Sequence, residues 1–150
     1  MLREQINADI IAAMKQKQQD RVRALRLINA AIKDRDISVR TQGRDEISEE
    51  EIMELLQKMC KQRRDSAAIY AQAGAQERAK IEQFELELIE SYLPKAMDEA
   101  ETQAAIDEII ARIGASTMAD MGKVMSLLKT EFSGQLDMAL AGPLVKRALS

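Results

Sequence analysis

The chain contains no histidine among its 150 residues. That absence excludes catalytic sites of the Ser-His-Asp and Cys-His types and most zinc and haem sites, because each of them depends on an imidazole. A glycine-rich loop of the kind that binds nucleotide phosphates is also missing. The sequence therefore predicts no catalytic residues, no metal site and no cofactor.

Cysteines and long apolar runs are equally scarce. Cys60 is the single cysteine, so no internal disulfide can form, and the first residues lack the apolar run of a signal peptide. No stretch approaches the roughly 18 consecutive apolar residues that a membrane span requires. We expect a soluble, cytoplasmic protein that does not bind membranes, with Cys60 as a buried and unreactive thiol on an apolar helix face.

Strand-forming and helix-breaking residues are few. There are two prolines, six glycines, two phenylalanines and two tyrosines, whereas strong helix formers are abundant. This composition predicts an all-α fold. Apolar side chains recur every three or four residues and indicate seven helices, four before Pro94 and three after it. We therefore expect an N-terminal helical domain at 1–94 and a C-terminal three-helix bundle at 95–150.

Helix-start and helix-end signals give the expected boundaries in the N-terminal part. The first helix is expected to end near Gln18 or Gln19, and Asp20 is a candidate cap for the second. The stretch from Asp34 to Glu46 loses its apolar period and predicts a loop, after which Ser48 and Glu51 form a capping box. The expected inward residues include Met14, Val22, Leu25, Ile28 or Leu27, Ile32, Ile81, Phe84 or Glu85, Leu88 and Tyr92.

The C-terminal part carries its own signals. A capping box is expected from Asp98 to Glu101, and a helix that Thr117 and Asp120 open should bury Met118, Met121, Val124 or Met125, Leu128 and Phe132. A last helix follows Asp137, and Gly142-Pro143 predicts a kink or a restart within it. Gly122 has two interpretations, because glycine weakens a helix: close helix packing, or close approach of an RNA backbone beside Lys123.

Charge is distributed unevenly along the chain. The net charge is −3, so any attraction to nucleic acid must be local. Nine basic side chains lie between Lys15 and Arg44 against three acidic ones, and a second basic group lies between Lys58 and Arg64. A solvated helix surface explains these charges more simply than RNA binding does, and aromatic platforms for stacking bases are missing.

Four ordered segments carry a family resemblance: Arg26 to Lys33 (RLINAAIK), Lys61 to Ser66 (KQRRDS), Glu87 to Pro94 (ELIESYLP) and Ala119 to Met125 (ADMGKVM). Together they resemble the YqeY family, which is similar to the C-terminal tail of the B subunit (GatB) of the tRNA-dependent Asp/Glu amidotransferase. The resemblance runs from near Leu2 to near Leu149, and the Gly142-Pro143 pair departs from it.

The resemblance implies a link to tRNA, since the amidotransferase tail helps to hold the tRNA while other domains carry out catalysis. It also implies that a carbon–nitrogen ligase label, with glutamine as amide donor, is inherited without residues that could perform the reaction. We expect a non-catalytic module whose partner is tRNA, an amidotransferase or an aminoacyl-tRNA complex. The candidate RNA-binding residues are Lys123, Lys129, Lys146, Arg147, Arg63 and Arg64.

Two other functions stay open. A protein-interaction adaptor without RNA binding is expected to use an apolar groove made by Met118, Met121, Met125 and neighbouring residues. A stand-alone amidotransferase is expected to release ammonia from glutamine, for which the sequence offers no residues.

Overall fold

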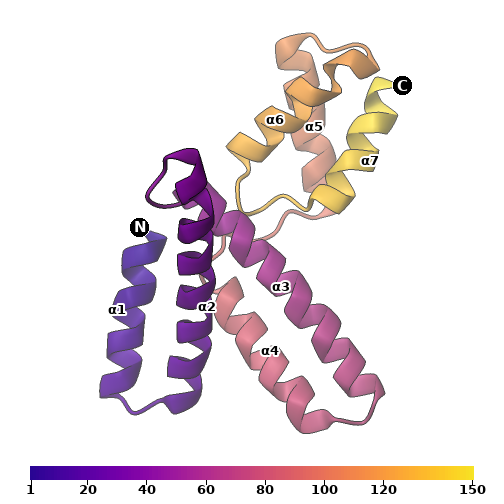
Figure 1. Cartoon of the computed structure of the whole chain (residues 1–150). Coiled ribbons are helices and arrows are strands. Elements are labelled where there is room, and N and C mark those ends of the chain that lie inside the picture. The colour runs from indigo at the N-terminus through magenta and orange to yellow at the C-terminus, as the bar shows by residue number, and fades with distance from the viewer. The chain divides into compact units, whose positions relative to one another are not determined.

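The helix-rich composition produces seven α-helices and two short 3₁₀ helices, without strands (Figure 1). In this computed structural model, which describes residues 1–150, the chain divides into two compact units, Met1–Leu93 and Pro94–Ser150. The all-α prediction and the count of seven helices are confirmed. None of the helices combines the length and the apolar character needed to cross a membrane.

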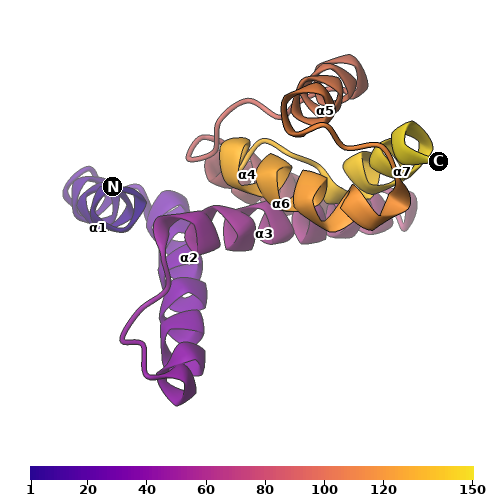
Figure 2. The same ribbon diagram turned by 90° about the horizontal axis from the view of Figure 1, so that it is seen from above.

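The N-terminal unit consists of two antiparallel helical hairpins. In Figure 1, α1 lies beside α2 and α3 beside α4, and Figure 2 shows α2 crossing α3 at a steep angle. The four helices are α1 (Leu2–Lys15), α2 (Gln19–Ser38), α3 (Glu49–Gln72) and α4 (Gln76–Glu90). All four contribute to one apolar core, whose most deeply buried side chains are Ile6, Leu25, Ile28, Ile32, Ile52, Leu56 and Ile89.

The predicted capping box at the start of α3 is confirmed. The Ser48 hydroxyl accepts the N–H of Glu51 at 3.2 Å, and the Glu51 carboxylate accepts the N–H of Ser48 at 3.1 Å. Arg44 also donates to the Glu51 carboxylate. The hydrogen bond from Arg44, followed by those from Ser48, lowers the pKa of Glu51 to about 2. Glu51 therefore stays ionised at the N-terminus of a helix, where the helix dipole favours negative charge.

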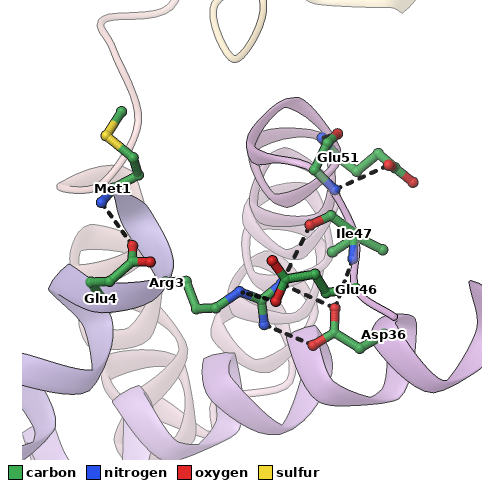
Figure 3. Close-up of polar contacts among 8 residues, drawn as sticks. Met1, Arg3, Glu4, Asp36, Glu46, Ile47 and Glu51 are labelled. Atoms are coloured by element: carbon green, nitrogen blue, oxygen red, sulfur yellow. Dashed lines mark hydrogen bonds and ion pairs between the residues drawn. The ribbon is translucent and has the colours of Figure 1, made fainter. Parts of the chain in front are cut away.

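The predicted loop from Asp34 to Glu46 is wrong for most of its length. The α2 helix continues to Ser38, and the 3₁₀ helix η1 (Val39–Gln42) follows it directly. Tertiary contacts hold this segment. Val39 is buried, and the Asp36 carboxylate accepts two hydrogen bonds from the Arg3 guanidinium at 2.7 and 3.0 Å (Figure 3). Asp36 also accepts the N–H of Ile47 at 2.9 Å, so one carboxylate joins α1, α2 and the start of α3.

Several expected core positions and helix ends in the N-terminal unit are wrong. Helix α1 ends at Lys15, and α2 begins without a side-chain cap, because Asp20 already lies inside the helix. Ile28 is buried rather than its neighbour Leu27. Met14 and Ile81 were expected in the core and are instead largely exposed, at 50% and 54%. Of the alternatives Phe84 and Glu85, Phe84 is 41% exposed, whereas the Glu85 side chain is 13% exposed. The helical period indicates the apolar side of each helix, but it does not determine which side of the α1–α2 hairpin packs against the α3–α4 hairpin.

The C-terminal unit contains α5 (Glu99–Ile113), the 3₁₀ helix η2 (Met118–Asp120), α6 (Met121–Glu131) and α7 (Met138–Leu149). The three α-helices contact one another in every pair. Asp98 accepts the N–H of Glu101 at 2.7 Å and so caps α5, which confirms one half of the predicted capping box; the reciprocal hydrogen bond to the Glu101 side chain is not formed. The shared core consists chiefly of Ala105, Ile106, Ile109, Val124, Leu128, Ala141, Leu144 and Val145.

Two predictions for the C-terminal helices need correction. Met118 is 42% exposed rather than buried, because it lies on η2 ahead of the packed part of α6. Of the two outcomes expected at Gly142-Pro143, the restart is wrong, since α7 includes both residues, and the kink stays a prediction. Pro143 is exposed, as is Ala139 one turn before it, whose carbonyl the proline cannot pair. The start of α7 is secured by Asp137, which accepts the N–H of Ala139 at 2.9 Å.

Candidate functional site

The start of α6 is held in place by one carboxylate. Asp120 accepts the N–H groups of Ser116 and Thr117 at 3.0 and 3.2 Å. These two backbone hydrogen bonds lower the pKa of Asp120, and the charge of nearby Lys123 lowers it further. The turn into η2 and α6 is therefore fixed by a capping box from Thr117 to Asp120, at the place where the sequence predicts a helix start.

A shallow groove lies beside this capped turn. It is lined by Ile113, Asp120, Gly122, Lys123, Ser126 and Leu127. Gly122 is exposed, and a Cβ added to it would meet no atom within 4 Å. Close helix packing, one of the two interpretations of Gly122, is therefore wrong. The glycine leaves an open strip of helix backbone next to the Lys123 ammonium group.

The candidate lysines of α6 do not all line the groove. Lys123 is part of its wall, whereas Lys129 is not. Lys129 nevertheless follows Gly122 and Ser126 at spacings of seven and three residues, which places the three on one side of α6. Near the groove, the helix backbone is therefore uncovered at Gly122, and Lys123 and Lys129 lie on two different sides of the same helix.

The other candidate basic residues lie elsewhere. Lys146 and Arg147 are exposed in the last turn of α7 and do not line the groove. Arg63 and Arg64 lie on α3, in the other compact unit. The structure therefore places Lys123 alone among the six candidates in the wall of the groove and does not unite the six in one surface.

Arg63 and Arg64 have acidic partners on α4. The Arg63 side chain, 20% exposed, lies 3.0 Å from the Glu85 carboxylate and 3.8 Å from that of Glu82. Arg64 lies 3.3 Å from Glu90 and is 57% exposed. The positive charges of Arg63 and Arg64 are thus balanced by carboxylates of α4. Spacing along the sequence does not reveal these pairs, because their members lie on different helices.

A family model described as Yqey-like protein matches residues 3–149. The match spans nearly the whole chain and includes both compact units. The chain belongs to the YqeY family. No curated protein matches it. The YqeY resemblance that the four sequence segments indicate is therefore confirmed.

The methionines of this YqeY chain do not form the groove that an adaptor was expected to use. Met121 and Met125 are only partly exposed and pack against the C-terminal core. Met118 is largely exposed, at 42%, as is Met138 on α7, at 43%. Of the three methionines expected to form the groove, Met118 is therefore the one that lies open to solvent.

Sequence reasoning missed part of the surface of this YqeY protein. Ile113 and Ser126 line the α6 groove, yet nothing in their local pattern separates them from ordinary helix positions. A second groove lies at the turn between α1 and α2, where Met14 was expected to be buried. No local pattern indicates this groove, because the first helix was expected to continue to Gln18 or Gln19 and Lys17 therefore lay inside it.

The thiol of Cys60 is expected to be unreactive in the folded protein. Cys60 is 2% exposed, and burial raises its pKa to about 11, so the thiolate is scarce at neutral pH. A thiol-reactive chromogenic disulfide should label no cysteine in the native chain within minutes and one cysteine after denaturation. Rapid labelling of the native protein would contradict the buried position.

Proposed function

We propose that this YqeY protein is a non-catalytic cytoplasmic module that binds tRNA, alone or together with a tRNA-dependent amidotransferase. Residues 1–94 are proposed to form an N-terminal helical domain and residues 95–150 a C-terminal three-helix bundle that carries the RNA-binding surface. Family membership supports the link to tRNA, through the similarity of the family to the amidotransferase tail. The α6 groove supports the location of the surface.

The exposed Gly122 is the observation that carries the proposal. Glycine inside a helical segment costs roughly 0.5–1 kcal/mol relative to alanine. No packing contact explains it, because a Cβ at this position would meet open space. A ligand that needs to approach the helix backbone closely does explain it, and a sugar-phosphate backbone is such a ligand when a lysine lies beside it.

The charges fit a weak and local phosphate site. Lys123 and Lys129 provide two positive charges on α6, and Lys146 and Arg147 provide two more on α7. Asp120 is the one carboxylate in the groove wall, and it is already engaged with two backbone N–H groups. Because the chain as a whole is negatively charged, affinity for tRNA should depend on these few contacts and fall steeply with salt.

Binding of purified protein to total tRNA, measured by fluorescence anisotropy at about 50 and 200 mM salt, tests the proposal. We expect Lys123→Ala to weaken binding and to reduce the slope of log Kd against log salt by about 1. Lys146→Ala and Arg147→Ala report whether α7 takes part. Lys80→Ala on α4, an exposed lysine outside the proposed surface, is the matched charge control and should change neither value.

Gly122→Ala distinguishes close backbone approach from a purely electrostatic role. The substitution should raise the stability of the protein by roughly 0.5–1 kcal/mol, since alanine favours the helix and the added methyl meets no neighbour. The same methyl should weaken tRNA binding. Unchanged tRNA affinity in a stabilised variant would remove the main support for the proposal.

The two alternatives predict different results. No tRNA binding at about 50 mM salt favours the protein adaptor, although Met121 and Met125 of its expected groove are partly buried. A stand-alone amidotransferase requires that the purified chain release ammonia from glutamine, and we expect no release. The chain has no histidine, and its single cysteine is buried.

A further inference from the structure

A second groove lies between the end of α1 and the start of α2, at the tip of the first hairpin. It is lined by Met14, Lys17, Gln19, Val22, Arg23, Arg26 and Leu27. Two of its apolar side chains are largely exposed, Met14 at 50% and Leu27 at 45%. Ile11, one turn before Met14 on the same side of α1, is 55% exposed. The groove thus has an apolar floor that the chain itself does not cover.

The rim of this groove is strongly basic. Between Lys15 and Arg26 there are five basic side chains and one acidic one, in a chain whose net charge is −3. Arg26 reaches over the groove, with a guanidinium nitrogen 3.8 Å from the Met14 sulfur. None of the three basic residues in the groove wall takes part in any of the ion pairs found in the structure; these residues are Lys17, Arg23 and Arg26. Their charges remain available to an acidic ligand.

The turn that carries Lys17 conflicts with ordinary helix-end chemistry. After α1, the N–H of Gln18 bonds to the carbonyl of Ala13, and Lys17 has a left-handed φ of 57°. The α3–α4 turn has the same pattern, with the N–H of Ala75 bonded to the carbonyl of Tyr70 and Gly74 at φ 76°. Glycine accepts that conformation freely, whereas a residue with a Cβ is strained.

Lys17 thus occupies, in the α1–α2 hairpin, the position that Gly74 holds in the α3–α4 hairpin. A lysine held in a backbone conformation that favours glycine, at an exposed place, is typical of a site that function maintains.

We propose that this groove binds an acidic amphipathic helix of a partner protein. The apolar floor suits the apolar side of such a helix, and the basic rim suits acidic side chains along its edges. Phosphate recognition alone leaves Met14 and Leu27 without a role, and no aromatic side chain in the groove can stack on a base. A membrane surface fits a protruding apolar face better than a groove.

The full chain, labelled with ¹⁵N, is titrated with a synthetic peptide helix of about 16 residues that has leucines at i, i+3, i+4 and i+7 and glutamates elsewhere. The same peptide with lysines in place of the glutamates is the matched probe. We expect the glutamate peptide to shift the amide signals of Lys17, Arg23 and Leu27 and the lysine peptide to shift none. Charge reversal at both Arg23 and Arg26 to glutamate should weaken binding about 10-fold or more.

Three variants complete the test. Leu27→Asp should weaken binding by removing the apolar floor, whereas Ile81→Asp, at an exposed apolar position on α4, should leave binding unchanged. Lys17→Gly should raise Tm by about 4 °C, because it relieves the left-handed lysine, and should nevertheless weaken binding. A variant that is more stable and yet binds more weakly has lost a binding contact, because a variant that binds weakly through unfolding is less stable.

The proposal is overturned if the glutamate peptide does not bind at millimolar concentration or binds no better than the lysine peptide. It is also overturned if tRNA, anionic phospholipid vesicles or a second copy of the chain gives these amide shifts and the glutamate peptide does not. These results are independent of tRNA binding at α6, which belongs to the other compact unit.

Discussion

Leu128→Ala is expected to unfold the C-terminal unit while the N-terminal unit stays folded. Leu128 is 0% exposed and belongs to a core formed only by residues from Met97 to Leu149. Replacing a buried leucine by alanine costs about 2–5 kcal/mol, because the transfer energy is lost and a cavity remains. A unit of this small size has a limited reserve of stability, so much of that reserve would be removed.

Two measurements detect this outcome. Far-UV circular dichroism should show partial loss of helix at room temperature, and amide NMR signals of residues 94–150 should collapse while those of residues 1–93 persist. Met118→Ala, at a largely exposed position of the same unit, should change stability by no more than about 0.5 kcal/mol. A single transition in which both units unfold together would contradict the proposal that they are separate domains.

Asp36→Ala is expected to destabilise the N-terminal unit by about 2–3 kcal/mol, because it removes the closer of the two carboxylates that face a largely buried guanidinium and leaves Arg3 with Glu46 at 3.5 Å. Asp36 and Arg3 are 14% and 22% exposed, and they form two hydrogen bonds. The variant also removes the acceptor of the Ile47 N–H. Urea denaturation monitored by circular dichroism measures the loss, and the exposed Asp34→Ala on the same helix is the control.

The pH dependence of stability gives an independent test of this contact. The hydrogen bond from Arg3 holds the pKa of Asp36 below its usual value. A carboxyl group whose pKa is lower in the folded state adds stability above its unfolded pKa and loses that contribution as the pH falls through the folded value. Asp36→Ala should therefore reduce the difference in stability between pH 7 and pH 3. An undiminished difference would show that the ion pair contributes little.

Helix N-termini were the most predictable features of this chain. Ser48, Asp98 and Asp137 cap helices at the places that the sequence predicts, because capping depends on a side chain and backbone N–H groups two or three residues away. Gly74 and Gly114 end helices for an equally local reason. The family followed from ordered segments and was confirmed over 3–149.

The candidate site was only partly predictable. Lys123 and Gly122 could be selected from the sequence, since a glycine within a helix is unusual wherever it occurs. The pairing of Arg63 with Glu82 and Glu85 could not, because it joins two helices across a hairpin. Only the structure shows that the Arg63 charge is already paired, so that Arg63 does not belong to a basic surface that is free to bind RNA.

The sequence by itself determined the helical class, most of the helix starts and the membership of the YqeY family, since these depend on composition, on neighbouring residues and on ordered motifs. Only the tertiary structure decided that 34–42 is helical rather than a loop, because Asp36 and Val39 are held by residues distant in the sequence. It also decided that Met14, Leu27 and Gly122 lie open to solvent. Amphipathic period shows which side chains can be buried, whereas burial itself depends on which helices pack together.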